Sequence, residues 1–152
     1  MDLRETILFK FREKLNKGEK KRILKKILKP LINIKDSEAL ILYSLVSNNA
    51  KKKLNLALLA YSEDFPPSIS FLAELLYERE KLKECYELYH IAANLNEAHA
   101  ANVLTALYKI GFDGFEKNET LSRKYEEISK NAKKWDFIEG YNKEYIMFEW
   151  KI

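Results

Sequence analysis

The chain has 152 residues, of which 47% are hydrophobic and 33% charged, and it contains only four Gly and three Pro. This composition excludes a disordered chain, and so few turn residues argue against a fold of many short strands. The length predicts a single domain, and the one cysteine, Cys85, excludes an internal disulfide framework.

Helical spacing of apolar residues runs through the first half of the chain. Helices are expected over Asp2–Asn16 and from Glu19 to about Lys29. Pro30 should end or kink the second helix, because proline lacks an N–H donor. Asp36 is a suitable N-cap for a third helix, and a fourth is expected after the break at Asn48-Asn49.

The same spacing is clearer in the second half. Pro67 suits the first turn of a fifth helix, a sixth and a seventh follow, and Gly111 should end the seventh. Asn118 can cap an eighth helix. Residues Phe137–Ile152 carry an apolar stripe that fits a ninth helix, although the last of them also alternate as a strand would. The elements together predict an all-α fold.

Charge and membrane signals bear on where the chain resides. Residues 1–35 hold twelve Lys and Arg against four Asp and Glu, a net charge of +8, whereas residues 36–152 have a net charge of −4. Basic residues interrupt the apolar positions of the first fifteen, which a secretory signal would not allow. The longest uncharged run, Ala39–Ala50, is shorter than the ~20 residues that span a bilayer. These features predict a cytoplasmic protein with a basic N-terminal end.

Similar residues recur at the spacing of one helical hairpin. Ala92 lies 32 residues after Ala60 and 37 residues before Ser129. The same register pairs Leu72 with Leu104, Ala73 with Thr105, and Leu76 with Tyr108. The five extra residues fall in the Gly111–Asn118 loop, where an insertion is tolerated. Each unit would be two antiparallel helices that bury their apolar faces by stacking on neighbouring units.

The segment Ala100–Ala132 resembles the Sel-one-like repeat, a relative of the tetratricopeptide repeat. The matching residues are Ala100, Leu104, Leu107-Tyr108, the loop GFDGFEKN at Gly111–Asn118, Tyr125 and Ser129. The preceding unit matches at Cys85, Leu88-Tyr89 and Ala92-Ala93 but lacks the glycine turn. The resemblance covers residues 67–134 well and residues 36–66 poorly, and it does not extend to the two ends.

This resemblance implies a right-handed α-solenoid of antiparallel hairpins with about eight to nine helices. Its single domain would comprise a basic helix pair at 1–35, repeat hairpins at 36–134 and an aromatic cap at 135–152. The first helices would line a concave surface that binds a protein or peptide. The partner-binding residues carried over are Ser70, Glu74, Tyr77, His99, Asn102, Ala106 and Lys109. The alternative interpretation is that these side chains merely face solvent.

No constellation for catalysis, a cofactor or a metal is visible in the sequence. His90 and His99 are the only histidines, they are expected on different helices, and no third ligand lies at a matching spacing. Cys85 occupies a position where the repeat needs a small residue, so packing explains it. The acidic loop around Asp113 lacks the ligand order of a calcium site. We therefore expect a non-enzymatic protein without a small-molecule substrate.

A basic stripe supports a different kind of partner. Its members, at helical spacing, are Arg22, Lys25, Lys26 and Lys29. Phosphates of nucleic acid or anionic lipids would attract such a stripe. Against this, the opposite helix face is entirely Leu and Ile, and no aromatic residue interleaves the stripe to stack on bases. A solvated helix face is the simpler interpretation.

Protein binding is the function that the sequence favours. The most specific hypothesis is a small bacterial immunity or inhibitor protein that neutralises a cognate toxin by binding it directly, and an adaptor of a larger complex fits nearly as well. The aromatic segment from Trp135 to Trp150 would be either a cap on the last repeat or the interface itself. The alternative from another class is a nucleic-acid or anionic-membrane binder that acts through residues 1–35.

Overall fold

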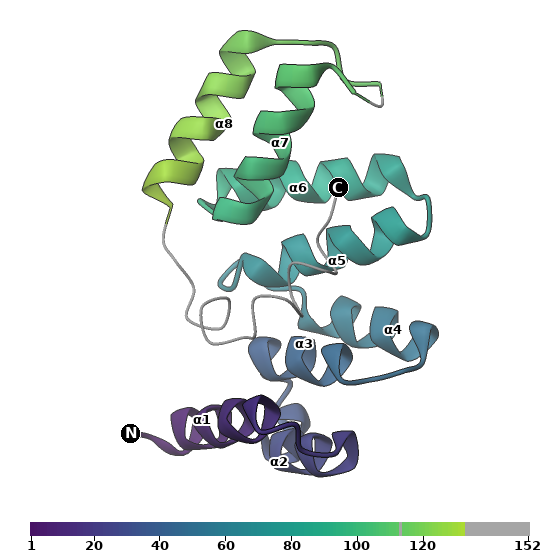
Figure 1. Ribbon diagram of the computed structural model, residues 1–152, viewed down its shortest axis with the longest axis vertical. Coiled ribbons are helices and arrows are strands. Elements are labelled where there is room, and N and C mark those ends of the chain that lie inside the picture. The colour runs from purple at the N-terminus through teal and green to yellow at the C-terminus, as the bar shows by residue number, and fades with distance from the viewer. Residues whose placement is uncertain (113, 133–152) are drawn as a thin grey trace.

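The computed structural model describes residues 1–112 and 114–132, and within these ranges the protein is all-helical, with no strand. Eight helices stack along the long axis of the molecule, with α1 and α2 at one end and α7 and α8 at the other (Figure 1). They are α1 (Leu3–Asn16), α2 (Lys21–Asn33), α3 (Ser37–Leu45), α4 (Ala50–Ala60), α5 (Pro67–Glu78), α6 (Leu82–Asn94), α7 (Ala98–Ile110) and α8 (Glu119–Asn131). The all-α prediction is confirmed, and the expected ninth helix at 137–152 lies outside the described residues.

The helix ends follow from local hydrogen bonding, as the sequence predicts. The side chain of Asp36 accepts a hydrogen bond from the backbone N–H of Ala39, and that of Asn118 accepts one from Leu121, each at 3.0 Å. Pro67 is the first residue of α5. Gly111 ends α7 in the left-handed conformation with φ of 71°, where a side chain would be strained.

The prediction for Pro30 allowed two effects, and the one in which the helix ends at this residue is wrong. Helix α2 continues past Pro30 and ends at Asn33. Leu28 and Leu31 are buried on the two sides of the proline, so the apolar stripe of the helix continues past it. Pro30 itself is exposed, which places its ring on the side of α2 that faces solvent. Burial of the stripe therefore outweighs the lost backbone hydrogen bond.

Two apolar clusters form the interior, and α5 contributes to both. The first joins α1 to α5 and includes Phe11, Leu28 and Leu72. The second joins α5 to α8 and includes Ile69 and Tyr89. Nine consecutive residues of α5, Pro67–Leu75, are buried, so this helix is enclosed by its neighbours on nearly every side. It is the central element that connects the two halves of the described chain.

The described helices differ in kind from membrane-spanning ones. None of them, within residues 1–112 and 114–132, combines the length and the apolar character that crossing a bilayer requires.

Candidate functional site

Two of the residues predicted to line a concave groove are buried instead. Ser70 is fully buried and donates a hydrogen bond to the Glu97 carboxylate at 2.5 Å. Glu74 is 3% exposed and accepts a hydrogen bond from the Tyr89 hydroxyl at 2.8 Å. Because α5 is enclosed, the face that the repeat resemblance assigned to a partner is turned toward α6 and the start of α7. Ser70 and Glu74 therefore do not line an open surface.

Glu97 holds the start of α7 from inside the protein. Its carboxylate accepts hydrogen bonds from the backbone N–H groups of His99 at 3.1 Å and Ala100 at 2.6 Å. Burial raises the pKa of Glu97, and the hydrogen bonds from Ser70 and from the helix backbone oppose that rise. The arrangement is a buried N-cap, and it explains structurally why Ser70 is needed on α5.

His99 and Tyr77 lie at intermediate exposure. The Nε2 atom of His99 is buried, and desolvation lowers the pKa of the imidazole to about 3. Its ring meets Tyr89 edge-on, with the centroids 6.1 Å apart. Tyr77 packs against the second apolar cluster. Part of each side chain therefore packs against the protein interior.

The remaining predicted groove residues form an exposed stripe on α7. Asn102, Ala106 and Lys109 are all exposed and follow one another at helical spacing. Ile110, which is 70% exposed, continues this stripe, and Phe112, just beyond the end of the helix, is 51% exposed. We call this set, Asn102, Ala106, Lys109, Ile110 and Phe112, the α7 surface. Sequence reasoning missed its two apolar members, whose signal was their place beside the helix-ending Gly111.

The contacts and burial of His90 and Cys85 are those of residues that stabilise the fold. A carbonyl can only accept, so His90 Nδ1 donates to the carbonyl oxygen of Tyr86 at 2.7 Å, and Nε2 accepts from the Tyr108 hydroxyl at 2.9 Å. Cys85 is fully buried. Among the residues that the structure describes, no group of three or more His, Cys, Asp or Glu side chains is placed to hold a metal ion.

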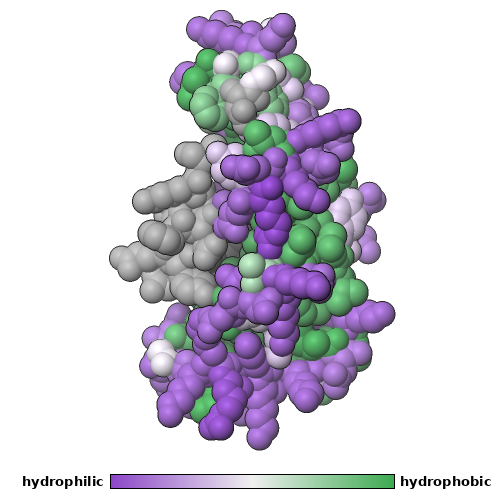
Figure 2. Space-filling model, turned by 90° about the vertical axis from the view of Figure 1, so that its right-hand side faces the viewer, coloured by the Kyte–Doolittle hydropathy of each residue, from purple (hydrophilic) through white to green (hydrophobic). Residues whose placement is uncertain are grey.

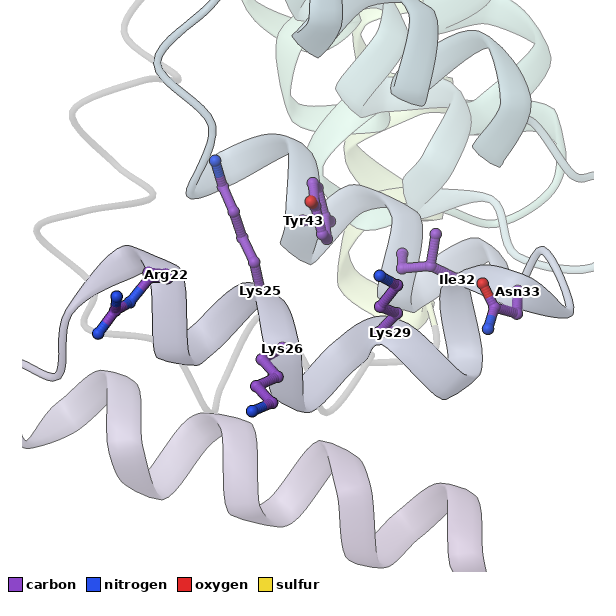
Figure 3. A pocket seen from close by; sticks show the side chains of 7 residues that line it. All are labelled: Arg22, Lys25, Lys26, Lys29, Ile32, Asn33 and Tyr43. Carbon is purple, nitrogen blue, oxygen red and sulfur yellow. The ribbon is translucent and has the colours of Figure 1, made fainter.

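The basic stripe of α2 lines a pocket between α2 and α3. The pocket has a volume of about 450 Å³, and its lining contains all four residues of the predicted stripe together with three others: Arg22, Lys25, Lys26, Lys29, Ile32, Asn33 and Tyr43. Lys25 and Lys29 extend from the side of α2 that faces α3 and Tyr43, whereas Arg22 and Lys26 extend away from α3 (Figure 3). We call this hollow the α2–α3 pocket.

Tyr43 supplies the aromatic ring that the basic stripe lacks in sequence. The ammonium groups of Lys25 and Lys52 lie 5.6 Å and 5.2 Å from the centroid of its ring. At such distances a cation is attracted by the face of the ring. The predicted stripe does not include this residue, because the stripe runs along α2 alone, whereas Tyr43 comes from α3 and Lys52 from α4. Its only sequence signal was an aromatic residue among the apolar positions of α3.

Two arginines of α1 serve the fold. Arg4 Nε lies 2.6 Å from Asp36, and the Nη2 atoms of Arg4 and Arg12 lie 2.9 Å and 2.5 Å from the Glu38 carboxylate. These contacts join α1 to the start of α3. The basic side chains of α2, by contrast, form no ion pair with any described residue. Hydrophilic residues accordingly dominate the N-terminal end of the molecule in Figure 2.

Comparison with known proteins returned no relative. No family model matches the chain, no curated protein matches it, and no solved structure is similar to it. The resemblance to the Sel-one-like repeat therefore rests on the residues quoted for it.

Proposed function

We propose that this protein is a non-enzymatic binding module, built as a right-handed α-solenoid of antiparallel hairpins of the Sel-one-like type. Equivalent positions of the proposed repeat have similar burial, since Ala60 and Ala92 are 1% and 0% exposed and Leu72 and Leu104 are 4% and 0% exposed. Helices two apart in sequence, α3 with α5 and α6 with α8, also pack together. Both features are typical of stacked hairpins.

The observation that carries the proposal is the α7 surface. Exposed Ile110 and Phe112 lie at the C-terminal end of α7 beside Lys109, which offers a positive charge. Asn102, whose Oδ1 accepts a hydrogen bond from Ser129, lies earlier on the same helix. Exposed large apolar side chains close to polar ones are typical of surfaces that bind proteins. A cognate toxin, with this chain as its immunity protein or inhibitor, is the specific partner that we favour. An adaptor role would use the same surface.

A site-specific crosslink tests the proposal in the source cell. A photoreactive amino acid at Ala106 should give one discrete adduct, which mass spectrometry can identify. The matched control is the same amino acid at Lys83, an exposed position on α6. The proposal is contradicted when both positions give the same adducts, because such adducts would report general proximity and not a bound partner.

Purified partner then allows a quantitative test. Ile110→Asp combined with Phe112→Asp should weaken binding by about tenfold or more, because buried anchors dominate protein interfaces. Ile34→Asp is the control, since Ile34 is 71% exposed and directly follows α2, which lies at the other end of the molecule from α7 (Figure 1). Circular dichroism should show the same helix content for all three proteins. Unchanged affinity in the folded double variant would exclude the α7 surface.

A nucleic-acid or anionic-membrane binder is the second candidate. The observation in its favour is the α2–α3 pocket, whose basic side chains remain unpaired with described residues. Loss of binding to DNA or anionic vesicles on raising the salt concentration would be its signature.

A further inference from the structure

We propose that the α2–α3 pocket is a binding site for a compact anion that carries several phosphate groups. This inference concerns α2, α3 and α4, and it does not depend on the α7 surface. The anion would be either a free polyphosphate or the phosphorylated headgroup of a lipid.

Uncompensated positive charge is the first argument. Helix α2 contains five Lys and Arg and no Asp or Glu. None of the described residues that line the pocket is acidic, and four of them are basic. Three acidic residues flank α2 in sequence. Glu19 accepts a hydrogen bond from the backbone N–H of Lys20, and Asp36 and Glu38 accept from Arg4 and Arg12. The pocket therefore keeps a concentrated positive potential, which an anionic ligand would relieve.

Pre-positioning of the lysines is the second argument. A free lysine side chain loses considerable rotamer freedom when it binds a ligand. The Tyr43 ring attracts both Lys25 and Lys52, at 5.6 Å and 5.2 Å, and so holds ammonium groups from α2 and α4 above one place on α3. The folded protein therefore already restricts these lysine side chains, which lowers the entropic cost of binding a ligand. Tyr43 acts as a positioning residue, and of the two lysines on its ring only Lys25 lines the pocket and contacts the ligand.

Size and lining define the ligand. A volume of about 450 Å³ is within the range of small-molecule sites, roughly 300–1,000 Å³. Phosphate oxygens form strong charge-assisted hydrogen bonds with lysine, and each phosphate group can accept from several donors at once. Asn33 adds an amide donor at one end, and Ile32 contributes apolar surface to the lining. Several phosphates on a small frame would satisfy these donors together.

The aromatic ring distinguishes this ligand from a single-stranded nucleic acid. Strands bind by stacking bases on free aromatic faces along a basic track. The ring of Tyr43 is approached by two ammonium groups, which a stacking base would have to displace. The basic residues of the pocket also come from a single helix, α2, and only Lys25 and Lys29 extend toward Tyr43. The observations therefore favour a compact anion.

Calorimetric titration of the purified full chain with inorganic tripolyphosphate, at about 0.15 M salt, is the primary test. We expect saturable binding with one site. Lys25→Gln combined with Lys29→Gln should weaken it by about tenfold or more. The control is Lys81→Gln combined with Lys83→Gln, which removes the same charge from exposed positions at the start of α6. Absent binding at this salt concentration, or equal weakening in the two variants, overturns the proposal.

Single substitutions keep the test decisive where the double variant fails to fold. Tyr43→Phe keeps the ring that attracts the lysines and should bind tripolyphosphate like the natural chain, whereas Tyr43→Leu should bind more weakly. Lys52 shares the Tyr43 ring but does not line the pocket, so Lys52→Gln, at an exposed position, should weaken binding less than Lys25→Gln. Equal affinities of the Phe, Leu and Gln variants would overturn the role assigned to this cluster.

Further arms of the experiment separate the sources. Flotation with phosphatidylcholine vesicles that contain a doubly phosphorylated phosphoinositide, against vesicles of equal charge made with phosphatidylserine, tests the lipid source. Selective capture by the phosphoinositide vesicles supports a headgroup, and binding of soluble inositol hexakisphosphate without capture supports a free anion. Tighter binding of a ten-nucleotide single-stranded RNA than of either phosphate compound overturns the proposal in favour of nucleic acid.

Discussion

The Nη2 atom of Arg12 lies 2.5 Å from Oε1 of Glu38, a side chain that is buried where α1 meets α3. Arg4 contacts the second oxygen of the same carboxylate at 2.9 Å. One acidic residue thus holds two arginines from α1. This relationship explains why part of the basic N-terminal charge belongs to the fold and part remains available to a ligand.

Loss of the Glu38 carboxylate should therefore destabilise the protein. We expect Glu38→Gln to lower the free energy of unfolding by about 1–3 kcal/mol, because Arg12 would stay partly buried without its partner. The value is below that of a fully buried pair, since Arg4 is 43% exposed and keeps its contact with Asp36. Urea denaturation measures it.

Glu13→Gln is the control for this substitution. Glu13 pairs with Lys17 on the surface of α1, and such exposed pairs contribute little to stability, so Glu13→Gln should leave the urea midpoint nearly unchanged. Equal effects of the two substitutions would show that the Glu38 cluster contributes no more than an ordinary surface ion pair.

Close packing around α6 offers a second prediction. Ala92 is fully buried in the cluster that joins α5 to α8. Ala92→Leu should lower the free energy of unfolding by about 1–3 kcal/mol, because extra methyl groups would force neighbouring side chains out of their rotamers. Ala106→Leu, at an exposed position of α7, should change it by less than about 0.5 kcal/mol. An unchanged melting midpoint for Ala92→Leu would contradict the assigned packing.

Local features of the chain were predictable because their causes are local. Asp36 and Asn118 cap helices through their own side chains three residues ahead, and Gly111 ends a helix by a backbone conformation of its own. These helix ends do not depend on which element the helix packs against. For this reason the sequence predicts the helix order and several helix ends.

Features that depend on distant pairing were not predictable in the same way. Ser70 meets Glu97 across 27 residues of sequence, and only the enclosure of α5 explains why both are buried. Tyr43 reaches the basic stripe from a different helix. The spacing of residues in the sequence shows which face of a helix is apolar. It does not show which element covers that face. The stripe on α2 was therefore predictable, and the pocket that it lines was not.

Acid sensitivity follows from His99. Its pKa is lowered to about 3 in the folded protein, against about 6.5 in the unfolded chain, because the ring is desolvated. Between these values the unfolded state binds more protons, so the contribution of His99 to stability is lost as the pH falls from about 6.5 toward 3. The slope is at most about 1.4 kcal/mol per pH unit. Burial of Glu97, whose pKa is raised, acts in the opposite direction above pH 4.5.

A variant separates these two opposing effects. Urea denaturation of the natural chain and of His99→Gln should be compared at pH 7.0 and pH 5.5. Since Gln does not titrate, the stability difference between the two proteins should change in favour of the variant at the lower pH. A difference that is the same at both pH values would mean that the imidazole takes up its proton as readily in the folded state as in the unfolded one.

Proline occurs twice inside or at the start of helices, and the same substitution should have opposite effects at the two positions. Pro30 interrupts the backbone hydrogen bonding of α2 and is exposed, so Pro30→Ala should restore a donor and raise the free energy of unfolding by about 1–2 kcal/mol. The gain is reduced because alanine leaves the unfolded chain more freedom.

Pro67 is fully buried at the first position of α5, where no donor is missed. Pro67→Ala removes buried methylene groups and should lower the free energy of unfolding by about 1–3 kcal/mol. Urea denaturation measures both changes. A loss of stability in Pro30→Ala would contradict a continuous α2 helix through Pro30, and a gain in Pro67→Ala would contradict the buried packing of Pro67.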